Sequence, residues 1–170
     1  MGVRLHLRRV RVPLLEVVFL AATAHGLVGV QLQDDEERFR VSLARRFPGS
    51  VLKGGNAVTT EAAREIRQYL GGGPDPKVDT VVPETGFQVC VWKQIARIPR
   101  GQVRSYGRLA RAVRRPRAAR AVGQACGRNP IPLVVPCHRV VAADGTLGGF
   151  GAGLVVKRKL LSLEGVRLRP

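Results

Sequence analysis

Short apolar runs with partial alternation dominate the first thirty residues of the chain. They are rich in valine and leucine and predict two or three antiparallel strands that turn at His25-Gly26. The runs occupy residues 3–12, 14–23 and 26–32. The second run follows several arginines and ends like a signal-peptide cleavage site, but Glu16 interrupts it. We therefore expect strands here rather than a cleaved leader.

Two helices are predicted between these strands and residue 70. The first begins at the acidic residues 34–37, which suit a helix N-terminus, and the second begins with Thr60 as its N-cap. Their apolar faces are Phe39, Leu43 and Phe47 in the first helix, and Ala63, Ile66 and Leu70 in the second. No residues here suggest a reaction, so we interpret 1–83 as a scaffold domain that ends in a Gly- and Pro-rich linker at 71–83.

The second half, residues 84–170, predicts helices. Thr85 is expected to cap a helix in which Cys90 and Trp92 pack, and whose apolar face is Phe87, Val91, Ile95 and Ile98. Two short basic helices follow. One is opened by Ser105 and reaches Val113, and the other spans 117–127, so together they fit a helix-turn-helix.

A last helix is predicted over residues 155–163. Val156, Leu160 and Leu163 would face inward, with Lys157, Arg158 and Lys159 outside. The fold class is therefore mixed, α/β of the α+β kind. A small N-terminal domain of antiparallel strands with helices precedes a mostly helical, winged-helix-like C-terminal domain, 84–170, that contains the helix-turn-helix.

Positive charge is concentrated in this second half. The chain has 29 Lys and Arg against 12 Asp and Glu, a net charge of +17, and no acid occurs between residues 85 and 143. Such a surface favours a polyanionic partner, either nucleic acid or an anionic membrane surface. A hydrophobic fraction of 45% is enough for a core, but no run reaches the roughly 18 apolar residues of a membrane helix.

The three cysteines are Cys90, Cys126 and Cys137, an odd number without regular spacing. This pattern argues against a disulfide framework and favours a reducing, cytoplasmic location. No cysteine and histidine spacing matches a zinc site, so we expect no metal.

A reactive thiol is indicated at Pro136-Cys137-His138-Arg139, between two valine-rich runs that predict buried extended segments. The proline stiffens the turn, and a neighbouring base or cation makes thiolate available near neutral pH. Glu164, an acid at the end of the last helix, could orient His138 in a Cys-His-Glu relay. The fragment alone fits a buried structural cysteine equally well.

The second helix of the helix-turn-helix is thin. Its small residues let the backbone approach a partner closely, and its long side chains are few. The small residues are Ala118, Ala119, Ala121, Gly123, Ala125 and Gly127, and the long ones are Arg117, Arg120, Gln124 and Arg128. This suits shape-based contact with a narrow groove, where Arg120 could insert beside an unstacked base. The alternative is a helix packed tightly against another helix.

These pieces resemble the O6-alkylguanine-DNA alkyltransferase family, also called methylated-DNA-protein-cysteine methyltransferases. The resemblance lies in Pro136-Cys137-His138-Arg139-Val140, the Ser105-Tyr106 helix start, residues 117–123, Arg128-Asn129-Pro130, Lys157 and residues 160–165. They occur in the family's order over residues 85–165, and the first half resembles the family's N-terminal domain only in layout.

The resemblance implies direct reversal of DNA damage. Cys137 would accept the alkyl group of O6-alkylguanine, and of O4-alkylthymine, in a single irreversible turnover. His138 would take the thiol proton through a water, supported by Glu164. Tyr106 would rotate the nucleotide and protonate the leaving guanine, while Asn129 links the recognition helix to the cysteine turn. No cofactor is implied, and the partner is double-stranded DNA, bound by a monomer through the minor groove with the base flipped out.

The resemblance also implies the contacts. For DNA these are Arg120, which would fill the gap in the base stack, with Ala119, Ala121, Gly123, Gln124, Ser105, Arg117 and Arg128; for the flipped base they are Tyr106, Val140, Phe150 and Gly151. Phe150 and Gly151 stand where many relatives have tyrosine and serine, so backbone donors would matter more. Two alternatives stay open: a lesion-binding or regulatory DNA-binding protein that does not use the thiol, and a cysteine hydrolase.

Overall fold

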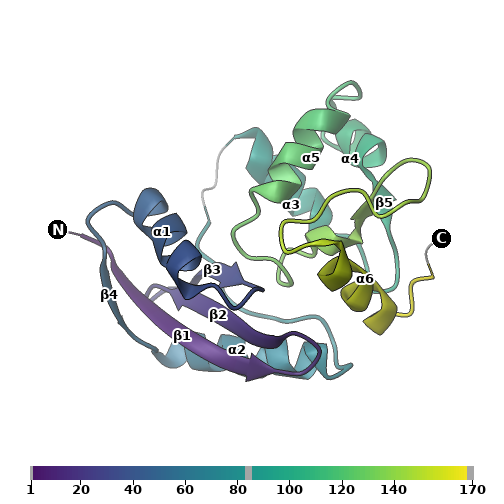
Figure 1. Cartoon of the computed structure of the whole chain (residues 1–170). Coiled ribbons are helices and arrows are strands. Elements are labelled where there is room, and N and C mark those ends of the chain that lie inside the picture. Colours follow the sequence, from purple (N-terminus) through teal and green to yellow (C-terminus); the bar gives the residue numbers. More distant parts are fainter. Residues whose placement is uncertain (1, 83–85, 168–170) are drawn as a thin grey trace. The chain divides into compact units, whose positions relative to one another are not determined.

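Two compact units make up the chain, Met1–Val82 and Pro83–Pro170. The structure is a computed structural model that describes residues 2–82 and 86–167 (Figure 1). The predicted domain boundary at residue 83 and the predicted cap Thr85 lie outside the described residues.

The N-terminal unit is built on a four-stranded sheet in the order β3-β2-β1-β4. Its strands are β1 (Arg4–Val12), β2 (Glu16–Ala22), β3 (Leu27–Gln31) and β4 (Val51–Gly54). The first three pair antiparallel as predicted, with His6 opposite Ala22 and Val12 opposite Glu16. Strand β4, which is parallel to β1, was not predicted, because this short and largely exposed edge strand has no apolar alternation.

Two helices cover opposite faces of this sheet, α1 (Glu36–Arg46) and α2 (Ala57–Leu70) (Figure 1). Phe39 and Leu43 of α1 pack with Phe19 in a core cluster of buried apolar side chains. Helix α2 begins three residues before the predicted cap Thr60. The side chain of Asn56 accepts a hydrogen bond from the Thr59 backbone, and the two residues form a capping box.

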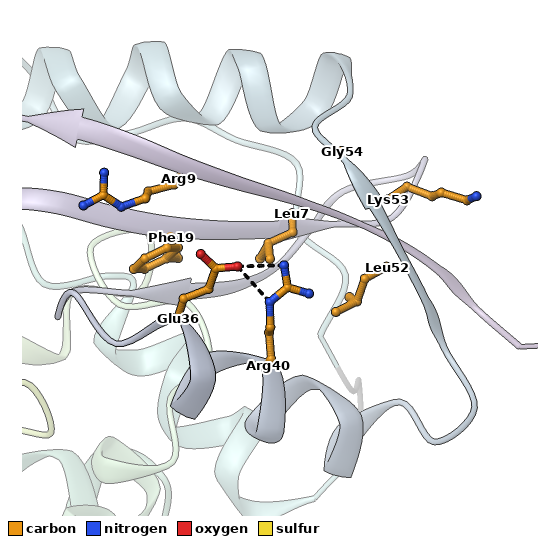
Figure 2. Close-up of a pocket in the computed structure, with 8 residues that line it drawn as sticks. All are labelled: Leu7, Arg9, Phe19, Glu36, Arg40, Leu52, Lys53 and Gly54. Carbon is orange, nitrogen blue, oxygen red and sulfur yellow. Dashed lines mark hydrogen bonds and ion pairs between the residues drawn. The ribbon is translucent and has the colours of Figure 1, made fainter.

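A surface hollow of about 470 Å³ opens on the α1 face of the sheet. Figure 2 shows its lining, in which Glu36 and Arg40, one turn apart on α1, pair beside Phe19. None of the residues predicted to carry the reaction lies in it.

Helices form most of the C-terminal unit. Its elements are α3 (Phe87–Ile95), β5 (Arg104–Ser105), α4 (Tyr106–Ala112), α5 (Ala119–Gly127), the 3-10 turn η1 (Cys137–Arg139), β6 (Val140–Val141) and α6 (Leu154–Leu163). Helices α4 and α5 form the predicted helix-turn-helix and pack against α3. Trp92 is buried and donates from Nε1 to the Ala125 carbonyl at 2.8 Å. Cys90 is exposed, contrary to the prediction that it packs, because it lies on the outer side of α3.

A two-residue parallel ladder joins the cysteine turn to the helix-turn-helix. Arg104 pairs with Val140, and Ser105 pairs with Val141. The prediction of an extended segment before the cysteine was wrong: residues 133–134 form a turn in which Leu133 has φ of 75°. Valine content alone did not reveal this turn, which brings Pro132 and Val135 into a bridge.

None of the helices within residues 2–82 and 86–167 is long and apolar enough to cross a membrane.

Candidate active site

Cys137 is the first residue of η1, and its side chain belongs to the core cluster of the C-terminal unit. Only 6% of the residue is exposed. Burial raises the pKa of the Cys137 thiol, and this effect exceeds the lowering by a hydrogen bond from Asn129 and by the charge of Lys157. Burial thus favours the neutral thiol in the resting protein, and the expectation that a neighbouring base makes thiolate available stays a prediction. The thiol needs a base to deprotonate it.

His138 and Glu164 form the predicted pair. His138 Nε2 lies 2.9 Å from Glu164 Oε1, and both side chains are fully buried. With Nε2–H donated to the carboxylate, the buried atom Nδ1 is the ring nitrogen that can accept a proton.

Arg139 completes this network and is itself buried, with 1% exposure. Its Nη2 donates to Glu164 Oε1 at 2.8 Å, and its Nε donates to Oε2 at 2.9 Å. Its Nη1 donates to the Ile98 carbonyl at 2.7 Å. The guanidinium donates to both carboxylate oxygens, and these hydrogen bonds hold Glu164 as an anion next to His138. The sequence indicated Arg139 only as a cation beside the thiol, and its pairing with Glu164 was not predicted.

Asn129 connects the end of α5 to the cysteine turn, as predicted. Its Nδ2 donates to the Val135 carbonyl at 2.8 Å, and its Oδ1 accepts from the Ile131 backbone at 3.1 Å. The same side chain forms the hydrogen bond that lowers the pKa of Cys137.

Tyr106 begins α4, which is capped by the Ser105 hydroxyl accepting from the Arg108 backbone at 3.2 Å. The tyrosine packs against the cluster that contains Cys137, and its hydroxyl lies 3.5 Å from the Gly149 carbonyl. Burial raises the pKa of Tyr106, so its hydroxyl keeps its proton. Gly148 has φ of +64°, and a Cβ there would lie 2.8 Å from the tyrosine hydroxyl, which leaves room for glycine only.

The prediction that Lys157 lies on the outer face of the last helix was wrong. It is buried rather than outside, and its Nζ donates to the carbonyls of Val140, Leu147 and Gly149. Burial lowers the pKa of Lys157 to about 8. A helical signal was present, because Lys157 lies three and four residues before the buried Leu160 and Leu161.

The predicted base pocket has a buried and an exposed part. Val140 is buried beside Cys137, and Phe150 packs against the same cluster. Gly151 follows on the exposed loop before α6. The structure thus brings Tyr106, Val140 and Phe150 together with the thiol.

Helix α5 has the predicted thin character. Its buried residues Val122 and Ala125 face the core, and a Cβ on Gly123 would lie 3.7 Å from the Tyr106 ring. Ala119 and Ala121 are half-buried. The long side chains point outward: Arg117, Arg120, Gln124 and Arg128 are exposed. The helix starts at Ala119, two residues later than predicted.

No group of three or more His, Cys, Asp or Glu able to hold a metal ion occurs in the part of the chain that the structure describes.

A helix-turn-helix unit with a buried thiol beside a His-Glu-Arg network defines a DNA-binding type of protein with a cysteine-based site. Residues 86–166 match the family model for the DNA-binding domain of 6-O-methylguanine DNA methyltransferase. The inducible methylated-DNA-protein-cysteine methyltransferase of Bacillus subtilis is 42% identical over 151 residues, which cover 86% of this chain and 83% of the relative. The Mycobacterium bovis enzyme of that name is 39% identical, with 85% of each chain covered. The chain belongs to this methyltransferase family.

Solved structures agree with this assignment. The Mycobacterium tuberculosis O6-methylguanine methyltransferase matches with a TM-score of 0.77 and 34% identity, covering 94% of this chain and 92% of its own. A structure of the same mycobacterial protein, OGT, in complex with DNA has a TM-score of 0.79 and 35% identity, with the same coverage. The Pyrococcus kodakaraensis enzyme matches with a TM-score of 0.63 and 26% identity over 95% of this chain and 99% of its own.

Proposed function

We propose that this chain repairs DNA by moving the alkyl group of O6-alkylguanine onto Sγ of Cys137. The observation that carries the proposal is a buried thiol next to the His138–Glu164 pair, on a helix-turn-helix unit of the methyltransferase family. In the reaction the alkyl carbon forms a bond to sulfur as its bond to O6 breaks. Both electrons of the broken bond leave with the guanine.

His138 acts as the general base. Nδ1 takes the thiol proton, through a water, as the lesion arrives, because burial keeps the thiol protonated beforehand. Glu164 accepts from Nε2 and stabilises the imidazolium that forms, while Arg139 holds the carboxylate in place. This division of roles gives a thiolate only when a substrate can use it.

The flipped base occupies the space beside Tyr106, Val140, Phe150 and Gly151. The raised pKa of Tyr106 keeps its hydroxyl protonated, so it can donate to the guanine as the alkyl group departs. A protonated guanine is a better leaving group. Gly151 contributes a backbone donor, since the chain has no side-chain hydroxyl at residues 150 and 151.

Double-stranded DNA binds along α5 from its minor-groove side. Ala119, Ala121 and Gly123 allow the backbone to come close, and Arg120 enters the stack where the base has left. Further contacts come from Ser105, Arg117, Gln124 and Arg128, of which all but the half-buried Ser105 are exposed.

Each molecule works once, because the thioether on Cys137 has no easy route back to a thiol. The protein acts as a monomer and without a cofactor. O4-alkylthymine presents a similar alkyl carbon and is included as a substrate. We place this work inside the cell, in the cytoplasm, where free thiols such as Cys90, Cys126 and Cys137 persist.

Mass spectrometry tests the proposal. After incubation with a duplex containing O6-methylguanine, the Cys137 peptide should gain one methyl group per molecule, and the Cys137→Ser variant should gain none. An unmodified Cys137 peptide after prolonged incubation would contradict the proposal.

A second candidate is a lesion-binding or regulatory protein that leaves its thiol unused. The raised pKa of Cys137 favours it, because a neutral buried thiol reacts slowly. It predicts that wild-type protein and Cys137→Ala protect cells from an alkylating agent equally well, whereas direct repair predicts that the variant protects no better than an empty vector.

A further inference from the structure

The C-terminal unit has a surface hollow of about 160 Å³ between the end of α3 and helix α4. Its lining combines apolar side chains, arginines and the amide of Gln94. The apolar residues are Ile98, Leu109 and Ala112, and the arginines are Arg97, Arg104 and Arg108. We call this set the arginine hollow.

Among the residues that the structure describes, no acid lines the arginine hollow. Within the described residues, Arg104 donates to two neutral oxygens, the Val103 carbonyl at 3.0 Å and Gln102 Oε1 at 2.9 Å. Within residues 86–167 no carboxylate pairs with Arg97 or Arg108, and the sequence has no acid between residues 85 and 143. Guanidinium groups that line one small hollow repel one another, and an anion bound there would lessen this repulsion.

The hollow on the N-terminal unit gives a contrast (Figure 2). There the arginines already have carboxylate partners: Arg40 lies 2.7 Å from Glu36, and Arg9 lies 3.0 Å from Asp34. In contrast, the arginine hollow is basic and has no acid among its described lining residues.

The arginine hollow is also connected to the active site. Arg139, which holds Glu164, donates to the carbonyl of Ile98 at 2.7 Å. Arg104 pairs with Val140 in the β5–β6 ladder, and the next residues along the chain are Ser105 and Tyr106. An anion bound here would lie against the segment that positions Tyr106.

We propose that Arg97, Arg104 and Arg108 bind a phosphate group, and that its source is the DNA backbone beside the reacting nucleotide. Planar guanidinium groups bind phosphate oxygens with paired, charge-assisted hydrogen bonds. The choice of DNA as the source rests on the proposed function, whereas the phosphate chemistry rests on the hollow alone. This site is separate from α5 and adds a contact at α3 and α4.

The salt dependence of DNA binding tests the site. The double variant Arg97→Gln, Arg108→Gln should bind an O6-methylguanine duplex about tenfold more weakly than wild type at ~0.1 M salt. The slope of log K against log salt concentration should fall in magnitude by about 0.9, the loss of one phosphate contact. The double variant Arg97→Lys, Arg108→Lys should recover most of both, which separates charge from folding.

A matched control removes two arginines from an exposed face of the N-terminal unit. Arg38→Gln, Arg45→Gln lowers the net charge equally and should keep both the slope and the methyl transfer to Cys137 near wild-type values. Equal losses of DNA affinity and of salt slope in Arg97→Gln, Arg108→Gln and in this control variant would overturn the proposal. Methyl transfer by the wild type is measured in the same samples. Absence of transfer would contradict the proposed function, whereas an unchanged salt slope in the glutamine variant would contradict the phosphate site.

Inorganic phosphate distinguishes the two sources. Millimolar phosphate is added to the wild type, and the arginine Nε–H signals are followed by nuclear magnetic resonance. If the phosphate comes from DNA, the Arg97→Gln, Arg108→Gln variant changes the salt dependence of DNA binding whatever these signals show. Loss of those phosphate shifts in the variant with an unchanged DNA slope would overturn the assignment to DNA and point to a free phosphate ligand.

Discussion

His138 Nε2 lies 2.9 Å from Glu164 Oε1, with both side chains removed from solvent. The carboxylate receives a second set of bonds from Arg139, so the base and its support are fixed before any DNA binds. His138 lies in η1 and Glu164 lies at the end of α6, so the position of α6 determines whether the pair forms.

Replacing Glu164 with glutamine should slow methyl transfer by about 10²-fold, because a neutral amide does not stabilise the imidazolium. Single-turnover transfer to Cys137 at saturating duplex gives the rate. Glu164→Asp keeps the charge and should recover part of it, while the exposed Asp144→Asn should react like wild type. A Glu164→Gln rate within twofold of wild type would remove Glu164 from the mechanism.

Arg139→Met should lower the free energy of unfolding by about 3–5 kcal/mol, since it leaves the Glu164 charge buried without its cation. Urea unfolding measures the change. The exposed Arg128→Met, at the end of α5, is the control and should change stability by about 0.5 kcal/mol or less. Similar values for the two variants would mean that Arg139 does not brace the site.

Lys157→Met should shift the reaction of Cys137 to higher pH. The charge of Lys157 lowers the pKa of the thiol, so its removal lets burial raise that pKa further. The rate of methyl transfer measured across pH reports the shift, and its neighbour Arg158→Met, which is exposed, should leave the profile in place. A profile unchanged by Lys157→Met would show that the lysine only anchors the loop.

Alkaline unfolding should depend on Cys126. Burial raises its pKa to about 12 from an ordinary value of 9.0. Between these pH values the unfolded thiol has lost its proton and the folded one has kept it, so stability falls as pH rises, by up to about 1.4 kcal/mol per pH unit. In urea titrations at pH 8 and pH 10, Cys126→Ala should lose less stability than wild type, with the exposed Cys90→Ala as control.

Arg120→Ala should impair lesion processing more than DNA affinity. Insertion into the stack stabilises the flipped state, whereas the other arginines supply most of the attraction to phosphate. We expect a rate at saturating duplex reduced about tenfold with a dissociation constant changed about threefold. Arg111→Ala, on the exposed side of α4, controls for lost charge. Equal reductions in rate and affinity would argue against insertion.

Period and capping residues predicted much of the fold. Phe39 and Leu43 are buried, and Ser105 caps its helix. Features that depend on distant partners were not predictable. The short strand β4 forms because it can pair with the edge strand β1. Arg139 is buried because it pairs with the Glu164 carboxylate, and Lys157 is buried because it donates to three backbone carbonyls. A charged residue is predicted to lie on the surface as long as its buried partner is unknown.

The candidate site divides in the same way. The residues around Cys137 indicated a reactive thiol supported by His138 and Glu164, and the resemblance to the family added Tyr106 and Asn129. The thiol's raised pKa could not be inferred, because it depends on how completely the core cluster encloses the sulfur.

That enclosure also affects the protein after it has reacted. Cys137 is 6% exposed and packed among apolar neighbours, so an alkyl group on sulfur adds atoms to a packed core. Overpacking a core costs about 1–3 kcal/mol. We expect the alkylated form to melt below the unused form, with a larger gap for longer alkyl chains. Spent molecules would then be distinguishable from fresh ones by their resistance to unfolding.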